Sequence, residues 1–295
     1  MLERHPSHPR SSDSVGLEVD VDRIADHWAV EQVADATPIG GGHHNKLFRW
    51  GDFVVRIEER VPTSVEWEHE LVAWLGDAIA EVVVPVRAPD GSTFLLVDQD
   101  QVVSLLPYVE GRHEPADASG LLARLHRRGC EWPGVRPRPG RPSYADLDWE
   151  RNDWWEWAVV PKLPGLVEAF EGLRAWAESR PPLAEVPIHG DFGLENVLVR
   201  SGRVVAILDW EYARMEWAAL EVGAAAMRFS PDDPSSFVRR YADAGGPGEV
   251  TAVRYGVRMW LLANCLYSLT SAAKGEPWSQ EWVDFSLGTL RDLSA

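Results

Sequence analysis

Cysteine, lysine and long apolar runs are scarce in this chain of 295 residues, and each scarcity excludes a class of protein. Its two cysteines, Cys130 and Cys265, lie far apart and form no CxxC pair, which argues against a disulfide framework, a zinc site and a redox pair. No apolar run approaches the roughly 18 residues of a membrane span, and the first residues lack the apolar centre of a signal peptide. We therefore expect a cytoplasmic protein without membrane contact.

Positively charged residues are also few compared with negatively charged ones. Arginine and lysine number 29 against 46 aspartates and glutamates, a net charge of −17, and Lys46, Lys162 and Lys274 are the only lysines. This charge repels nucleic acid and anionic lipid, and no dense basic segment offsets it, so we predict no nucleic-acid partner. The same charge would attract cationic ligands, although it serves solubility equally well.

Apolar residues are plentiful, at 45%, which is enough to bury the core of one large domain or of two joined lobes. Residues 1–20 are rich in Pro, Ser and His and are predicted to form a mobile tail. Residues 21–109 read as short strands with turns between them, whereas helical periods dominate residues 110–295. The sequence thus predicts an α+β protein with a β-rich amino-terminal lobe and a mainly helical carboxyl-terminal lobe.

A short helix is expected near Val21 to Val30, and one further helix is expected to pack on the sheet of the amino-terminal lobe. Thr63 and Glu66 have the spacing of a capping box at its start, and Gly76 has the position of a stop. Apolar residues at helical spacing, among them Trp67 and Leu71, predict that one face of this helix packs on the sheet.

The most informative segment is His-Gly-Asp-Phe-Gly-Leu-Glu-Asn at residues 189–196, followed thirteen residues later by Asp209. Phosphoryl transfer needs a carboxylate that orients the acceptor hydroxyl and oxygen ligands that hold Mg²⁺ against the phosphates. We predict Asp191 as the catalytic base, and Asn196 with Asp209 as the magnesium ligands. The alternative is an ordinary turn rich in Asp and Asn, which explains neither the spacing nor the second aspartate.

At these residues the chain resembles the aminoglycoside phosphotransferase and choline kinase-like family, whose members carry an HGD-x4-N loop followed by an ILDWE-type strand. The same residues fit the wider protein-kinase pattern His-x-Asp-x4-Asn. The resemblance implies a bilobal protein-kinase-like fold that uses Mg²⁺ with ATP or GTP. It also implies that His189 holds the catalytic loop by hydrogen bonds and that Leu198 lies under the nucleotide base.

The glycine run at residues 40–42 is weak evidence for phosphate binding by itself, and only its position before a strand supports that role. Alone, the segment that ends at Asn45 could be a hairpin turn, but it precedes a strand that places Val54 and Arg56 on one face. In the family such a loop covers the phosphates, so we predict that Gly41, Gly42 and Asn45 contact nucleotide. Val54 would then cover the base and Arg56 would contact phosphate, with Lys46 as the competing cation.

Two acidic residues complete the predicted machinery. Glu70 lies on the helix between two tryptophans, where it can orient Arg56 by an ion pair; otherwise it is a carboxylate on the rim. Glu221 stands where the family often has an acidic residue in an Asp-Leu-Ala helix start, and its role is left open.

The acceptor is predicted to be a small molecule. Position 190 is Gly where protein kinases carry an arginine, and no long activation segment follows Asp209, so a protein substrate is disfavoured. Residues 146–157 combine carboxylates with indoles, which would suit a cationic acceptor such as an aminoglycoside-type antibiotic, unless the tryptophans only pack in the core. A metabolic kinase for choline, homoserine or a sugar and a nucleotide-binding pseudokinase are the alternatives. No obligate protein partner is evident.

Overall fold

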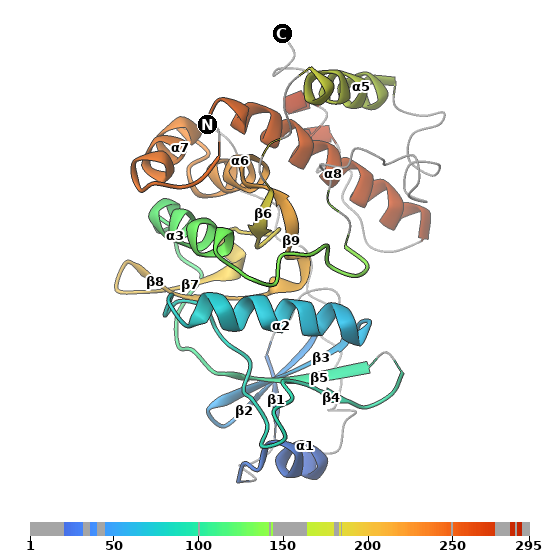
Figure 1. Ribbon diagram of the computed structural model, residues 1–295, viewed down its shortest axis with the longest axis vertical. Helices are drawn as coiled ribbons and strands as arrows, with labels where there is room; N and C mark the ends of the chain where they lie inside the picture. The colour runs from blue at the N-terminus through green and yellow to red at the C-terminus, as the bar shows by residue number, and fades with distance from the viewer. Residues whose placement is uncertain are drawn as a thin grey trace. The chain divides into compact units, whose positions relative to one another are not determined.

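The computed structural model describes most of the chain (Figure 1). The predicted tail, the glycine run with Gly41 and Gly42, and the acidic tryptophan segment 146–157 lie outside the described residues. The residues described are 21–31, 36–39, 45–99, 101–141, 143, 164–179, 183, 185–248, 250–274, 284–286 and 288–290.

Two compact units make up the chain, and neither is one continuous stretch of sequence. The first unit comprises Met1–Ala116, Trp132–Arg141 and Leu194–Glu211, and the second comprises Asp117–Glu131, Pro142–Gly193 and Tyr212–Ala295. The chain leaves the first unit after residue 116 and returns to it twice. Asn196 and Asp209 therefore belong to the first unit, whereas Asp191 belongs to the second.

An antiparallel sheet of five strands forms the centre of the first unit, in the order β1-β2-β3-β5-β4. Gly51, with a φ of 60°, makes the tight turn between its second and third strands. Buried aromatic and branched side chains such as Phe48, Val55 and Leu105 form a core on this sheet together with α1. The elements are α1 (Val21–Trp28), β1 (Thr37–Pro38), β2 (Lys46–Trp50), β3 (Phe53–Glu59), β4 (Leu95–Leu96) and β5 (Gln101–Pro107).

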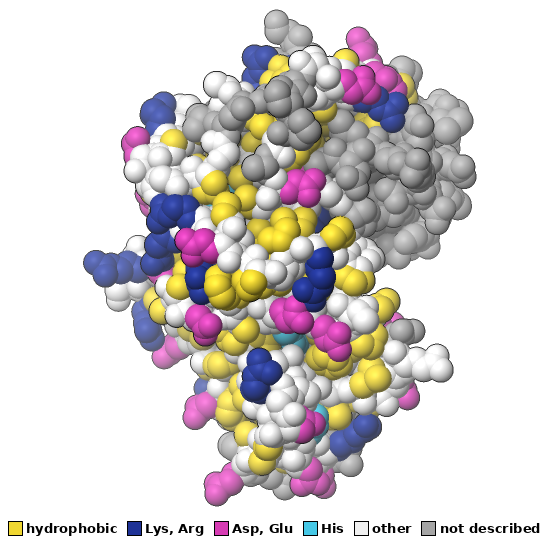
Figure 2. All heavy atoms as spheres, in the orientation of Figure 1, with side chains coloured by type: hydrophobic (Ala, Val, Ile, Leu, Met, Phe, Trp, Pro, Cys, Tyr) yellow, Lys and Arg dark blue, Asp and Glu magenta, His cyan; other side chains and the backbone are white. Residues whose placement is uncertain are grey.

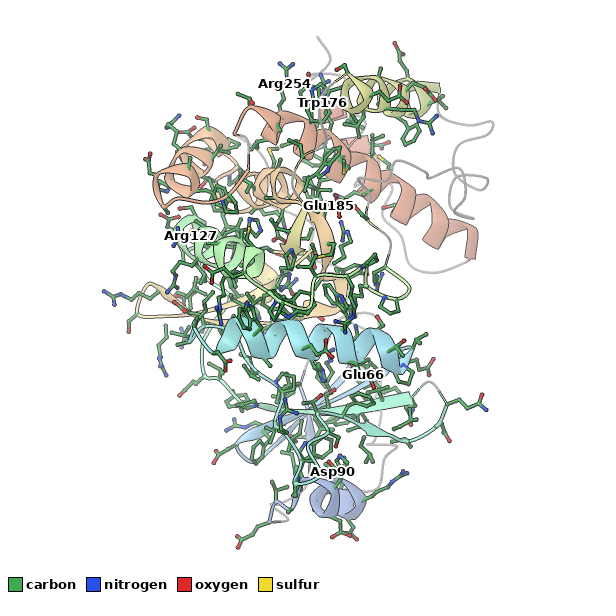
Figure 3. The ribbon with its side chains drawn as sticks, in the orientation of Figure 1. Glu66, Asp90, Arg127, Trp176, Glu185 and Arg254 are labelled. Carbon is green, nitrogen blue, oxygen red and sulfur yellow. The ribbon has the colours of Figure 1, made fainter. Side chains whose placement is uncertain are left out.

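The helix expected after Thr63 is α2 (Pro62–Gly76), and it ends at the expected glycine, while the short helix expected near Val21 to Val30 is α1. The predicted capping box is wrong, because the N-cap is Val61 and no side chain caps the helix. Glu66, labelled in Figure 3, is exposed. A proline in the first turn has a φ already suited to the helix and lacks the N–H that would need a cap.

A hairpin from the later part of the chain completes the first unit. It consists of the short helix η3 (Leu194–Asn196), then β7 (Val197–Arg200) and β8 (Arg203–Ile207), and it continues into η4 (Trp210–Tyr212). Its turn is made by Ser201 and Gly202, with φ of 53° and 73°. Bridges from Val82 to Ile207 and from Arg112 to Val199 tie the hairpin to the unit.

The second unit is mainly helical, with one short antiparallel pair of strands. Its longest helix, α8, packs on α6, and Gly256 permits this contact because a Cβ there would stand 2.0 Å from the carbonyl oxygen of Ala219. Trp176 of α5, labelled in Figure 3, stacks on Tyr255 of α8 with ring centroids 3.8 Å apart. The elements are α3 (Ser119–Cys130), α5 (Pro164–Glu178), β6 (Glu185–Ile188), β9 (Arg214–Trp217), α6 (Ala218–Phe229), α7 (Pro234–Asp243), η5 (Val250–Ala252) and α8 (Val253–Lys274).

Acidic side chains are distributed in small groups over the face shown in Figure 2, among basic and apolar ones. On this face, then, the negative charge of the described residues does not gather into one patch. Within the described part of the chain, no helix is long and apolar enough to cross a membrane.

Candidate active site

Arg56 is a buried cation on β3 of the first unit. Its Nη2 atom lies 2.7 Å from Glu68 Oε1 and 3.0 Å from Glu58 Oε1. Burial by itself lowers the pKa of Arg56, but the charges of Glu58, Glu68 and then Asp209 outweigh it and raise the pKa well above its ordinary value. Arg56 is therefore held fully charged.

The prediction that Glu70 orients Arg56 is wrong, because Glu68 makes this ion pair. The buried side of α2 passes through Ser64, Glu68 and Leu71, successive turns of the helix, and Glu70 lies outside it. Its carboxylate is exposed and pairs with Arg136, with Nη2 and Oε2 2.6 Å apart. The periodicity located the helix, but a two-residue difference moves a carboxylate from one side of a helix to the other.

Three charged side chains surround the Arg56–Glu68 pair and form with it what we call the arginine–glutamate cluster: Arg56, Glu58, Arg60, Glu68 and Arg138. The second oxygen of Glu68 accepts from Arg60 Nη1 and from Arg138 Nη2, both at 2.7 Å. Burial alone would raise the pKa of Glu68, yet its three arginine neighbours hold it well below the ordinary value. Each carboxylate is shared between arginines, so the cluster depends on all of its members.

Arg138 joins helix α2 to the turn that carries Asp209. It comes from the segment 132–141, and burial lowers its pKa to about 10. Its guanidinium donates to Ser64 and Glu68 on α2 and, through Nη1, to the carbonyl of Trp210 at 3.1 Å. No sequence motif marks this arginine, because its partners lie about 70 residues away on either side.

The hairpin brings the two predicted magnesium ligands to its open end. The backbone N–H of Leu208 donates to the carbonyl of Asn196 at 2.8 Å, so Asn196 and Asp209 lie at adjacent positions. Asp209 has a φ of 59°, a left-handed conformation that is uncommon outside glycine and is often found at functional sites. Next to Asn196 along the chain, the carbonyl of Val197 accepts a hydrogen bond from His113 Nδ1 at 3.0 Å.

Asn45, at the end of the predicted phosphate loop, is bound to the same turn. It is buried, and its Nδ2 donates to Glu211 Oε2 at 2.9 Å. Asn45 is therefore joined to the Asp-Trp-Glu sequence that starts at Asp209, which the spacing along the chain did not predict.

Among the described residues, the remaining predicted nucleotide contacts are half-buried or exposed. Val54 is half-buried on β3, and Leu198 is half-buried on β7, where its Cβ would lie 2.8 Å from a Cβ at Gly111. Lys46 pairs with Ile57 across the sheet, so it projects from the face opposite to Arg56. The register favours Arg56 over Lys46 as the cation on the face of Val54.

The residues of this turn suit Mg²⁺ by their donor chemistry. Asn196 and Asp209 offer amide and carboxylate oxygens, the hard donors that Mg²⁺ prefers, and Mg²⁺ commonly takes its other ligands from phosphate and water. Within the described ranges, no three His, Cys, Asp or Glu side chains gather as a metal centre. A metal shared with a nucleotide fits these two residues better than a metal held by protein alone.

In the second unit, the loop after β6 carries Asp191. The backbone N–H of Asp191 donates to His189 Nδ1 at 3.2 Å, in agreement with the expected role of His189 in holding the loop. Gly190 has a φ of 85°, and a Cβ there would stand 2.0 Å from the carbonyl oxygen of Tyr212. This contact gives a backbone reason for glycine at the position where protein kinases carry arginine.

Glu221, whose role the sequence left open, binds the backbone of this loop. It is buried in α6, and its two oxygens accept from the N–H of His189 at 3.0 Å and of Gly190 at 2.6 Å. His126 of α3 also bonds to it at 2.8 Å. Burial alone would raise the pKa of Glu221, but the hydrogen bond and charge of His126 lower it. We call Glu221 and His126 the loop anchor.

Sequence reasoning missed the charged partner of Asp191. Arg228, in the last turn of α6, places Nη1 2.6 Å from Asp191 Oδ1. The side chain of Arg228 is 8% exposed and that of Asp191 is 38% exposed. The partner follows Asp191 by 37 residues, and no spacing rule links the two positions.

Comparison with protein families finds a match to the model of the phosphotransferase enzyme family over residues 35–258. Among curated proteins, hygromycin-B 4-O-kinase from Escherichia coli is 37% identical over 57 residues, 19% of this chain and 16% of that protein. Homoserine kinase from Gluconobacter oxydans (strain 621H) is 25% identical over 210 residues, 66% of this chain and 64% of that protein. The chain thus spans less than two thirds of the length of either protein.

Solved structures show the same fold. An amicoumacin kinase in complex with AMP-PNP, Ca²⁺ and Ami has a TM-score of 0.70 at 13% identity, with 92% of this chain and 91% of that chain covered. A microcompartment-associated aminopropanol kinase has a TM-score of 0.67 at 19% identity, with 93% and 95% covered. The predicted α+β, protein-kinase-like fold of small-molecule kinases is confirmed.

Proposed function

Because this chain belongs to the phosphotransferase enzyme family, we propose that it transfers the γ-phosphate of ATP or GTP to a hydroxyl of a small molecule, with Mg²⁺. The observation that carries this proposal is the buried ion pair of Arg56 and Glu68. Arg56 is close enough to Asp209 for the charge of Asp209 to raise the pKa of Arg56. A charged arginine beside the predicted metal ligand is what the polyphosphate of a nucleotide requires.

In the first unit, the proposed roles concern the nucleotide. Asn196 and Asp209 would hold Mg²⁺, which when bound neutralises charge on the β- and γ-phosphates. Arg56 would bind phosphate oxygens, and the arginine–glutamate cluster would keep its side chain in place. The remaining proposed contacts are Val54 and Leu198 on the base and Gly41, Gly42 and Asn45 on the phosphates.

The proposed roles in the second unit concern the acceptor. Asp191 would accept a hydrogen bond from the acceptor hydroxyl, orient its oxygen toward the phosphorus and take its proton as the new bond forms. Glu221 would hold the backbone of the loop through the N–H groups of His189 and Gly190. Since phosphoryl transfer depends mainly on positioning, a rigid loop contributes directly to the rate. We place this reaction in the cytoplasm, where nucleoside triphosphates are available.

We propose a cationic acceptor, such as an aminoglycoside-type antibiotic. The proposal is supported by the carboxylates and indoles of residues 146–157, by the net charge of −17 and by the similarity to a kinase named for hygromycin B. A metabolic amino alcohol is the second candidate, because the match to homoserine kinase extends over 66% of the chain. A pseudokinase is disfavoured because Asp191, Asn196 and Asp209 are all present.

A nucleotide-consumption assay with a panel of acceptors tests the proposal. The panel contains hygromycin B, kanamycin, choline, homoserine, aminopropanol and a neutral sugar, each with ATP or GTP and Mg²⁺. We expect turnover with at least one amine-bearing acceptor and a fall in kcat on the order of 10²-fold or more in Asp191→Asn. Asp209→Ala should abolish Mg²⁺-dependent nucleotide binding. Nucleotide binding without transfer to any acceptor or to water would support the pseudokinase instead.

A further inference from the structure

Helix α6 holds the Asp191 loop through both its backbone and the side chain of Asp191. Glu221 binds the backbone N–H groups before Asp191, and Arg228 binds the carboxylate of Asp191 itself. The two residues are seven positions apart, which is about two helical turns, so they project from the same side of α6. A single rigid helix therefore determines both the path of the loop and the direction of its charged side chain.

Gly193 leaves room for this arginine. A Cβ at this position would stand 2.2 Å from both Cζ and Nε of Arg228, far closer than any real contact. Gly193 is not among the described glycines with a positive φ, so its backbone conformation does not itself require glycine. The guanidinium crosses the backbone where a side chain is absent, which is a separate sign that the loop accommodates Arg228.

A third contact links the loop to the same end of α6. The buried ring of Phe192 lies 5.3 Å from the ring of Phe229, centroid to centroid, one residue after Arg228. Apolar packing thus fixes the residue that follows Asp191, and the arginine fixes Asp191. With its carboxylate 38% exposed, Asp191 would otherwise lose rotamer freedom on every encounter with an acceptor.

We propose that Arg228 is a positioning residue, which holds the carboxylate of Asp191 in the orientation that the acceptor hydroxyl needs. This inference rests on the proposed function, because it assumes that Asp191 meets the acceptor. A charge-assisted hydrogen bond at 2.6 Å restricts the side-chain torsions of Asp191 before the acceptor arrives. The ordering is then complete in the free enzyme, and this lowers the entropic part of the barrier.

The test is a double-mutant cycle. Arg228→Met should lower kcat on the order of 10- to 100-fold and change the nucleotide KM by less than about threefold, because the lost role concerns the acceptor side. In the Asp191→Asn background the same substitution should lower kcat no further. An equal fall in both backgrounds would show that Arg228 acts through general stability and would overturn the proposal.

Three further variants sharpen the cycle. Arg228→Lys keeps the charge but shortens the reach, so it should recover part of the loss. Gly193→Ala should lower kcat like Arg228→Met, because its methyl group collides with the guanidinium. The matched control is Arg240→Met on α7, which removes an exposed arginine paired with Asp117 and should leave kcat unchanged.

Hydrogen exchange gives a readout that does not depend on activity. The amides of residues 189–193 should exchange at least several-fold faster in Arg228→Met than in the wild type or in Arg240→Met. Unchanged exchange would overturn the inference, as would faster exchange with an unchanged kcat. If the wild type consumed no nucleotide, the proposed function would fail, and exchange would still decide whether Arg228 holds the loop.

Discussion

The arginine–glutamate cluster of the first unit and the loop anchor of the second unit stabilise their sites in different ways. In the cluster, three arginines share two buried carboxylates. In the anchor, one carboxylate accepts two backbone N–H groups and a bond from His126. A buried ion cluster depends on charge balance, whereas a carboxylate bound to backbone N–H groups depends on geometry.

This difference predicts separate consequences for mutations. Damage to the cluster should lower folding stability and nucleotide binding together, because Arg56 belongs to it. Damage to the anchor should lower kcat more than it weakens nucleotide binding, because Glu221 binds the backbone of the Asp191 loop.

The largest effect is expected for Glu68→Gln. The substitution removes the charge that Arg56, Arg60 and Arg138 share, and losing one partner of a buried ion pair destabilises a protein by about 3–5 kcal/mol. Urea denaturation measures the loss, and the nucleotide KM should rise in parallel.

The matched control for this prediction is Glu70→Gln, on the same helix. It breaks only the exposed pair with Arg136, so it should change stability by less than about 1 kcal/mol. Equal losses in the two variants would contradict the assignment of Glu68 as the partner of Arg56.

A second prediction concerns acid sensitivity. His69, next to Glu68 on α2, is buried, and burial lowers its pKa from 6.5 to about 4. The unfolded chain therefore binds a proton between these two values while the folded chain does not, so stability falls as the pH drops from 6.5 to about 4. The full loss from this group is about 3 kcal/mol.

His69→Gln provides the comparison for the pH effect. The difference in unfolding free energy between wild type and variant, measured at several pH values, should shrink as the pH falls through this window. A constant difference between pH 4 and pH 6.5 would mean that His69 does not titrate between the two states.

Glu221→Gln tests the anchor. One of its two oxygens becomes an NH₂ group, which faces donors, and leaving buried donors without an acceptor costs about 1–3 kcal/mol. We expect kcat to fall about tenfold, with a change in nucleotide KM of less than about threefold. Steady-state kinetics with varied nucleotide measures kcat and the nucleotide KM. A rise in nucleotide KM without a fall in kcat would contradict the predicted difference between the loop anchor and the arginine–glutamate cluster.

The smallest effect concerns the acceptor. If negative charge attracts a cation, the acceptor KM should rise a few-fold as salt shortens the screening length to about 8 Å at physiological ionic strength. The nucleotide KM, measured alongside, should rise less. A salt-independent acceptor KM, or a neutral sugar as the best substrate, would rule out the cationic acceptor and leave the kinase proposal intact.

Much of the fold could be predicted from local patterns. The strand β3, the turn at Ser201 and Gly202 and the end of α2 at Gly76 all depend on neighbouring residues, and the structure contains each of them. The start of α2 could not be predicted in the same way, because a proline and a capping box are competing signals at adjacent positions. The side of α2 that faces Arg56 was predicted wrongly, because the apolar residues of the helix extend over more than one face and do not distinguish Glu68 from Glu70.

The family, the fold class and the spacing of Asp191, Asn196 and Asp209 follow from the sequence, because they depend on residues that are close along the chain. The pairing of Glu68 rather than Glu70 with Arg56, and the binding of the loop by Glu221 and of Asp191 by Arg228, follow from the folded structure alone. Contacts over long separations depend on how the elements pack, and packing angles scatter by about 15–20° for the same local pattern.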